Sequence, residues 1–102
     1  MGDTCGSCAA DSSDILQGLR HAKAARLGKA NGAATWQQDE AMAKAHLEAA
    51  LAHYRSMDEA DRAELKRSVR TALEGSDIED MSGLVEGLGA EDLLDLLPLL
   101  LL

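Results

Sequence analysis

Aromatic side chains are nearly missing from this chain. Among its 102 residues there is no phenylalanine, and Trp36 and Tyr54 are its single tryptophan and its single tyrosine. A core must therefore be built from aliphatic residues, and a chain of this length buries only about 60–65 % of the surface that it exposes when unfolded. Such a thin core leaves little room for a deep substrate pocket, and no nucleophile with a base, carboxylate pair or glycine-rich phosphate loop stands in a suitable context. We expect a protein without enzymatic activity.

Basic residues are missing from the last quarter of the chain. Residues 1–76 hold eleven acidic and all ten basic residues, whereas residues 77–102 hold seven acidic residues and no basic one. The formal net charge is −8, and nucleic acid binding needs clustered lysine and arginine, so we expect no nucleic acid partner. Four basic residues of the first half recur at every third position: Arg20, Lys23, Arg26 and Lys29. This stripe is expected to stay solvated or to meet the acidic quarter of the same or a neighbouring copy.

Long apolar runs and cysteines are also scarce. No run reaches the roughly 18–20 apolar residues that a membrane-spanning helix needs, and no charged and then apolar leader opens the sequence. The two cysteines, Cys5 and Cys8, cannot form a disulfide framework, which agrees with a reducing compartment. The sequence therefore predicts no transmembrane segment and a cytoplasmic location.

The remaining pattern predicts an all-α fold, a small helical bundle without strands. Residues 1–10 are expected to form a flexible, cysteine-containing arm, residues 11–75 a three-helix body, and residues 76–102 an acidic, leucine-rich docking segment that is helical only when docked.

Caps and glycines predict the helix boundaries in the body. The first helix is expected to begin after Asp11–Ser13 and to stop near Gly28. Capping boxes at Thr35 and Ser56 are expected to open the second and third helices. Because these two helices meet in a very short turn, we predict an antiparallel αα-hairpin over about 35–75.

One face of the second predicted helix carries a heptad-like apolar seam. Its members are Trp36, Ala43, Leu47, Ala50, Tyr54 and Met57. A seam with this spacing packs against another helix. We expect it to supply either the core or a dimer interface.

The chain ends in "LLDLLPLLLL", which contains eight leucines: Leu93, Leu94, Leu96, Leu97, Leu99, Leu100, Leu101 and Leu102. Burying them is worth on the order of 12–24 kcal/mol at about 1.5–3 kcal/mol each, against about 5–15 kcal/mol for the stability of a whole domain. In an α-helix the first four would surround most of the circumference, so one groove of a thin body would not cover them all. We therefore predict a partner-binding element that docks on a protein partner or a second copy; burial in the protein's own bundle is the alternative.

The two cysteines allow a second class of function. Cys5, Cys8 and His21 match part of a C-x2-C-x12-H zinc spacing, although a fourth ligand is missing. A module that binds zinc or iron, or that exchanges a disulfide, is therefore the alternative to an adaptor. Two reduced thiols on a mobile arm, or acylation together with Gly2, are further alternatives, although Gly6 breaks the myristoylation pattern.

The other two histidines give no metal motif. His46 and His53 lie seven residues apart, about 10.5 Å along one helix, which is too far for one ion. They are expected to pack or to lie on the surface. In sum, the sequence predicts a non-enzymatic helical interaction or adaptor protein, with a structural subunit of a larger assembly, such as a virion, as a further alternative.

Overall fold

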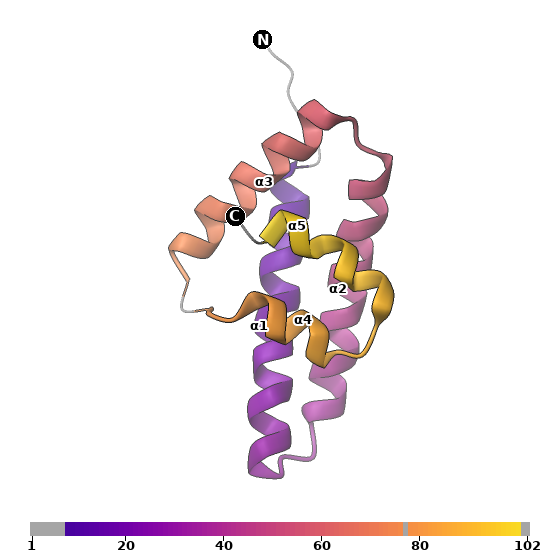
Figure 1. The fold of residues 1–102 in the computed structure, drawn as a ribbon. Coiled ribbons are helices and arrows are strands. Elements are labelled where there is room, and N and C mark those ends of the chain that lie inside the picture. Colours follow the sequence, from indigo (N-terminus) through magenta and orange to yellow (C-terminus); the bar gives the residue numbers. More distant parts are fainter. Residues whose placement is uncertain (1–7, 77, 101–102) are drawn as a thin grey trace.

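Two long antiparallel helices carry the rest of the molecule (Figure 1). The computed structural model describes residues 8–76 and 78–100, and every element in them is helical. In chain order the elements are α1 (Cys8–Asn31), α2 (Trp36–Ser56), α3 (Glu59–Glu74), α4 (Met81–Gly87), the 3₁₀ helix η1 (Glu91–Leu96) and α5 (Leu97–Leu100). The all-α class expected from the sequence is confirmed.

Close packing of α1 on α2 depends on a glycine. A Cβ atom built on Gly18 would lie 2.7 Å from Cγ of Leu47 and 3.2 Å from the carbonyl oxygen of Ala43, so a side chain there would push the helices apart. Ala43, Leu47 and Ala50 are fully buried, and Tyr54 is half-buried. The seam predicted on the second helix therefore faces the interior of this chain, along α1.

The bounds of α1 differ from the expected ones at both ends. Residues 8–10 were assigned to the arm, but they form the first turn of α1. Gly28 was expected to end the helix, but it lies inside α1, where a Cβ atom would come within 3.0 Å of Cβ of Trp36. Gly28 therefore permits close approach of α2, and the break falls at Gly32, whose φ of +75° favours glycine.

The strong antiparallel hairpin is formed by α1 and α2, not by α2 and α3. The expected short turn between α2 and α3 is present, but Met57 and Asp58 have extended backbone, which directs the chain away from α2. α3 then packs on α1 and on α5, and Figure 1 shows it slanting away from α2. The hairpin predicted over about 35–75 thus lies one helix earlier.

Arg62 holds this turn. Its Nε donates to the carbonyl oxygen of Tyr54 at 3.0 Å, and its Nη2 donates to that of Arg55 at 3.1 Å. The guanidinium also lies 4.8 Å from the centre of the Tyr54 ring. One side chain from α3 therefore satisfies carbonyls that the end of α2 leaves without helical partners. Asp58 caps α3 by accepting from the backbone N–H of Asp61 at 2.9 Å.

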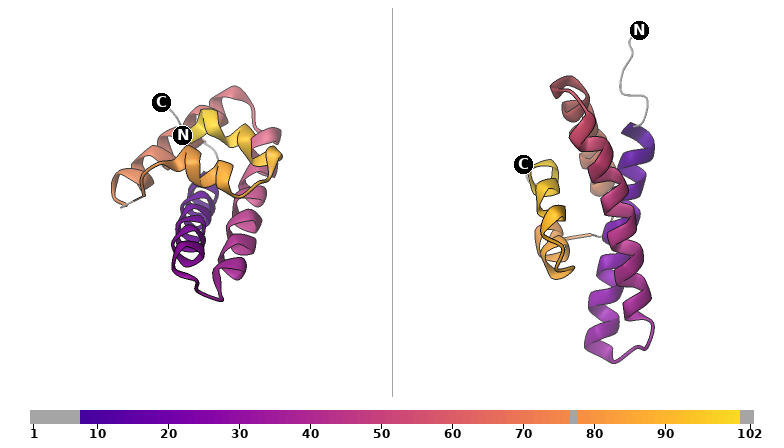
Figure 2. Two further views of the ribbon diagram at one scale, coloured as in Figure 1. Left: turned by 60° about the horizontal axis from the view of Figure 1, so that its bottom comes forward. Right: turned by 90° about the vertical axis from the view of Figure 1, so that its right-hand side faces the viewer.

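The C-terminal segment, residues 78–100, forms a layer beside the α1–α2 hairpin (Figure 2). α4 packs on α1, η1 on α2, and α5 on α3. Asp80 adopts a left-handed conformation with φ of 54°, and its carboxylate accepts from the N–H of Gly83 at 3.3 Å. A Cβ atom on Gly83 would collide with that carboxylate. Asp80 therefore caps α4.

The core lies where the hairpin, α3 and the C-terminal segment meet. The aliphatic residues that are buried in it come from all six elements and from the loops on either side of α4: Ile15, Leu19, Ala22, Ala43, Leu47, Ala50, Leu51, Leu65, Val69, Ile78, Leu84, Val85, Leu88, Leu93, Leu96, Leu99 and Leu100. No single pair of helices closes this core, because each face of the hairpin offers only a narrow alanine and leucine strip. The C-terminal segment is thus part of the fold.

Candidate interaction surface

The structure places most of the C-terminal leucines inside the molecule. Leu93 and Leu96 are fully buried, and Leu99 and Leu100 are 3 % and 4 % exposed. Leu97 is half-buried, and Leu94 is 38 % exposed. Leu101 and Leu102 lie outside the described residues. This corrects the expectation that the whole leucine strip is open to a partner, because four of its members are core residues of this chain.

The correction has a geometric cause. Residues 91–96 form a 3₁₀ helix, which has three residues per turn, so side chains three apart lie on one face. Leu93 and Leu96 share that face, and Leu99 continues it in α5. The sequence argument assumed 3.6 residues per turn, which spreads the same leucines around the helix. With the tighter period they fall into separate rows: Leu93 and Leu96 face the core, and Leu94 lies outside it.

The outer side of the C-terminal segment is acidic. Its six described acidic side chains are all exposed: Glu79, Asp80, Glu86, Glu91, Asp92 and Asp95. Three of these are neighbours of Leu94 along η1, and we call Leu94 with Glu91, Asp92 and Asp95 the acidic knob. It is an exposed leucine with three exposed acidic neighbours, in a segment that has no basic residue of its own.

One member of the acidic knob is paired within the chain. Arg55 of α2 donates from Nη2 to Asp95 at 2.6 Å. This hydrogen bond raises the pKa of Arg55 above its ordinary value. Glu91 and Asp92 have no ion pair with any described residue. Two carboxylates beside Leu94 are therefore available to a cationic partner.

The basic stripe of α1 meets the acidic quarter in the same chain. Arg26 donates from Nη1 to Asp80 at 3.3 Å, which ties α1 to the start of α4. Lys29 instead lies with its Nζ 4.5 Å from the centre of the Trp36 ring, and no carboxylate of the described residues pairs with it. Within the stripe, Arg26 thus forms an ion pair with the C-terminal segment, whereas Lys29 forms none with a described carboxylate.

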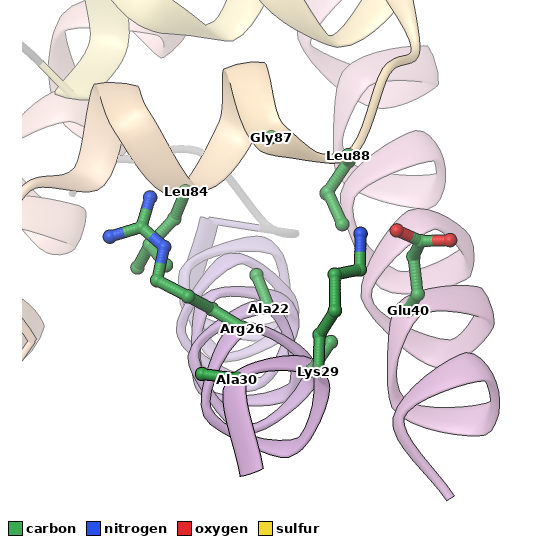
Figure 3. Close-up of a pocket in the computed structure, with 9 residues that line it drawn as sticks. Ala22, Arg26, Lys29, Ala30, Glu40, Leu84, Gly87 and Leu88 are labelled. Carbon is green, nitrogen blue, oxygen red and sulfur yellow. The ribbon is translucent and has the colours of Figure 1, made fainter. Parts of the chain in front are cut away.

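A small cavity opens between α1, α2 and α4 (Figure 3). Its volume is about 280 Å³, and it is lined by Ala22, Ala25, Arg26, Lys29, Ala30, Glu40, Leu84, Gly87 and Leu88. Figure 3 shows Arg26 and Lys29 reaching from α1 toward α4, with Glu40 on α2 opposite Lys29. We call this cavity the alanine-floored pocket. Most of its lining residues are apolar, and its charged lining residues are two cations, Arg26 and Lys29, and one carboxylate, Glu40.

All three histidines pair with aspartates across the α1–α2 hairpin. The Nδ1 to Oδ1 distances are 3.0 Å for His21 with Asp39, 3.1 Å for His46 with Asp14, and 2.7 Å for His53 with Asp11. The rings of His21 and His46 are parallel to within 5°, with centroids 5.8 Å apart. These pairs link the two helices side by side, so they fix the register of the hairpin.

The sequence analysis did not predict these three histidine–aspartate pairs. A signal was present, because Asp14 precedes His21 by seven residues and Asp39 precedes His46 by seven. On antiparallel helices two such motifs place each aspartate opposite a histidine. Asp11 is fully buried, and its Oδ2 has no hydrogen-bond partner among the described residues. The expectation of packing or surface histidines omitted these partners.

The candidate metal residues do not come together. Cys8 and His21 lie thirteen residues apart on the continuous helix α1, or about 20 Å at 1.5 Å per residue. Cys5 lies outside the described residues. Within residues 8–76 and 78–100, no group of three histidine, cysteine or acidic side chains is placed to hold a metal ion.

Cys8 is disulfide-bonded rather than a free thiol. It is 3 % exposed, and its Sγ lies 3.6 Å from the carbonyl oxygen of Asp61 in α3. A disulfide sulfur has no proton to donate, so this is a packing contact and not a hydrogen bond. Reduction or exchange of a disulfide requires access to the sulfur. The alternative of two reduced thiols on the N-terminal arm is therefore wrong for Cys8.

Comparisons with protein families, with curated proteins and with solved structures find no significant match to this chain. Over the described part of the chain, no helix is both long enough and apolar enough to cross a bilayer.

Proposed function

We propose that this protein is a non-enzymatic interaction module, and that the acidic knob on its C-terminal segment is the docking element. The observation that supports this proposal is the selective exposure of Leu94. Its leucine neighbours Leu93 and Leu96 are buried in the core, whereas Leu94 lies outside among exposed carboxylates.

The proposal keeps the docking role expected from the sequence but narrows its surface. A strip of eight leucines is replaced by one leucine and three acidic residues, in a segment in which Asp95 pairs with Arg55 and Asp80 pairs with Arg26 of the hairpin. Such a surface selects a partner with an apolar recess and cations at its rim, because desolvated leucine supplies affinity and charge supplies orientation. The cytoplasmic location stays a prediction.

The test compares two exposed leucines. Full-length protein carrying Leu94→Glu is compared with wild type and with Leu27→Glu as tagged baits in quantitative capture from lysates of the source cells. Leu27 is 53 % exposed and lies on α1, so the control has the same substitution at a surface outside the acidic knob. Proteins that are lost with Leu94→Glu and kept with Leu27→Glu support the proposal. If no captured protein depends on Leu94, the proposal is wrong.

A further inference from the structure

We propose that the partner of the acidic knob is a second copy of this chain, and that the knob docks in the alanine-floored pocket of that copy. This inference rests on the proposed function, because it names the partner of the same docking element. In this complex Leu94 enters the recess between α1, α2 and α4 of the other copy, and the carboxylates of the acidic knob pair with the cations at the rim.

Size supports a single aliphatic side chain as the occupant. The pocket holds about 280 Å³, just below the roughly 300–1,000 Å³ of sites for drug-sized ligands. Its floor consists of Ala22, Ala25 and Ala30, whose short side chains leave the recess open. A leucine that is already 38 % exposed in the free molecule fits such a recess with little rearrangement of its own helix.

Charge complementarity supports a leucine that is flanked by acids. Lys29 forms no ion pair with a carboxylate among the described residues, and Glu91 and Asp92 form none with a cation. Asp92 interacts with Arg55 only at longer range. Arg26 and Lys29 at the rim outnumber Glu40. Docking therefore gives partners to charges that the single molecule leaves without them. Copies with a net charge of −8 repel one another at long range, but at about 0.15 M salt this repulsion is screened beyond about 8 Å while contact pairs persist.

The other apolar recess fits the acidic knob less well. It lies between α3, α4 and α5, with a volume of about 410 Å³. Arg70 and Glu74 stand among its lining residues and cancel in charge. Leu99 and Leu100 of α5 are also among its lining residues. The cationic rim thus distinguishes the alanine-floored pocket as the receptor.

The expected association is weak. One leucine and its neighbours bury less surface than the roughly 1,200–2,000 Å² of standard stable complexes. We expect dimers or short oligomers of the full-length protein to form at about 0.1–1 mM in 0.15 M salt, as measured by sedimentation equilibrium.

Two single variants and two matched controls test the contact. Leu94→Gln removes the apolar tip, and Lys29→Glu reverses the rim; each is expected to weaken association at least about tenfold. Met42→Gln and Lys66→Glu are the controls. Met42 is 47 % exposed on α2, and neither residue lines the alanine-floored pocket. Circular dichroism confirms that all four variants keep the fold.

A charge swap gives the decisive measurement. Asp92→Lys is expected to weaken self-association, but a mixture with Lys29→Glu is expected to associate more strongly than either variant alone. The knob of the Asp92→Lys chain then meets the pocket of the Lys29→Glu chain as one new pair of opposite charge, and the reverse pairing keeps the wild-type charges. This result supports the inference.

Three results would overturn it: a wild type that stays monomeric to about 1 mM, a Leu94→Gln variant that associates like wild type, or loss of association in Met42→Gln, which would place the interface on the outer face of α2. A monomeric wild type whose captured partners still depend on Leu94 rejects the second copy and leaves the proposed function standing. If the wild type neither self-associates nor captures any protein that depends on Leu94, both this inference and the proposed function are wrong.

Discussion

The α1–α2 hairpin and the C-terminal segment bury apolar side chains by different means. α1 and α2 have 24 and 21 residues, well above the roughly 12–15 at which isolated helices become marginal. α4 and α5 have seven and four residues and are far below that length. The hairpin supplies a surface of its own, whereas the C-terminal segment becomes helical by docking on it.

The comparison explains the leucine-rich end of the sequence. Short helices need a large apolar contact per residue to become ordered, since each ordered residue costs about 1–2 kcal/mol of backbone entropy. Leu93, Leu96 and Leu99 supply that contact. The leucine-rich end was expected to form an exposed binding surface. Most of these leucines are instead needed for packing, because the short helices of this segment have little stability of their own.

The largest expected effect breaks the docking of the C-terminal segment. Leu96→Ala removes a fully buried side chain and should lower the free energy of unfolding by about 2–5 kcal/mol, as measured by urea denaturation. Leu94→Ala, the matched control on the exposed side of η1, should change it by less than about 0.5 kcal/mol. Equal effects at the two positions would contradict the assignment of faces.

The next effect concerns the packing of the hairpin. Gly18→Ala places a methyl group against Leu47 and the backbone of Ala43 and should cost about 1–3 kcal/mol through overpacking. Gly75→Ala is the control, because a Cβ atom there meets nothing within 4 Å. Its unfolding free energy should stay the same or rise. A neutral Gly18→Ala would show that the hairpin tolerates a wider helix spacing.

A smaller effect separates the two regions by their caps. Asp80→Ala removes a side chain that caps α4 and should cost about 0.5–2 kcal/mol, with faster amide exchange in residues 81–88. Thr35→Ala in the hairpin should cost less than about 0.5 kcal/mol, because the Thr35 side chain makes no capping bond to α2. Equal losses of unfolding free energy in the two variants would contradict this difference in capping between α4 and α2.

The smallest effect belongs to the exposed ion pair between the regions. Arg55→Gln removes the partner of Asp95, but both side chains are largely exposed, and surface pairs contribute little. We expect the midpoint of urea unfolding to stay unchanged within error at 0.15 M salt. A clear shift would show that this pair helps to hold η1 on α2.

Much of the hairpin could be read from the sequence because its signals are local. The helical period of Ala43, Leu47 and Ala50 predicted the buried face of α2. A break at Gly32 was also expected, although α1 continues past Gly28, near which it was expected to stop, to Asn31. Which helices pair was not local information. Met57, Asp58 and Arg62 turn α3 toward α1, and their combined effect appears only when the chain is folded.

The exposure of the C-terminal leucines was predicted less well, because it depends on the number of residues per helical turn, which the sequence does not specify. Residues three apart lie in one row on a 3₁₀ helix, so Leu93 and Leu96 fall in one row of η1, which is buried, and Leu94 falls in another, which is exposed. The cross-helix pairs of His46 with Asp14 and His21 with Asp39 likewise needed the hairpin register.

The sequence by itself determined the helical class, the long helices and the acidic, base-free end, because these follow from residue types and spacings along one chain. The tertiary structure alone decided which helices pair, which leucines enter the core, and that Leu94 remains outside beside Glu91 and Asp92. The physical reason is that burial is shared between segments distant in sequence, so each side chain's exposure is set by the neighbours that folding brings to it.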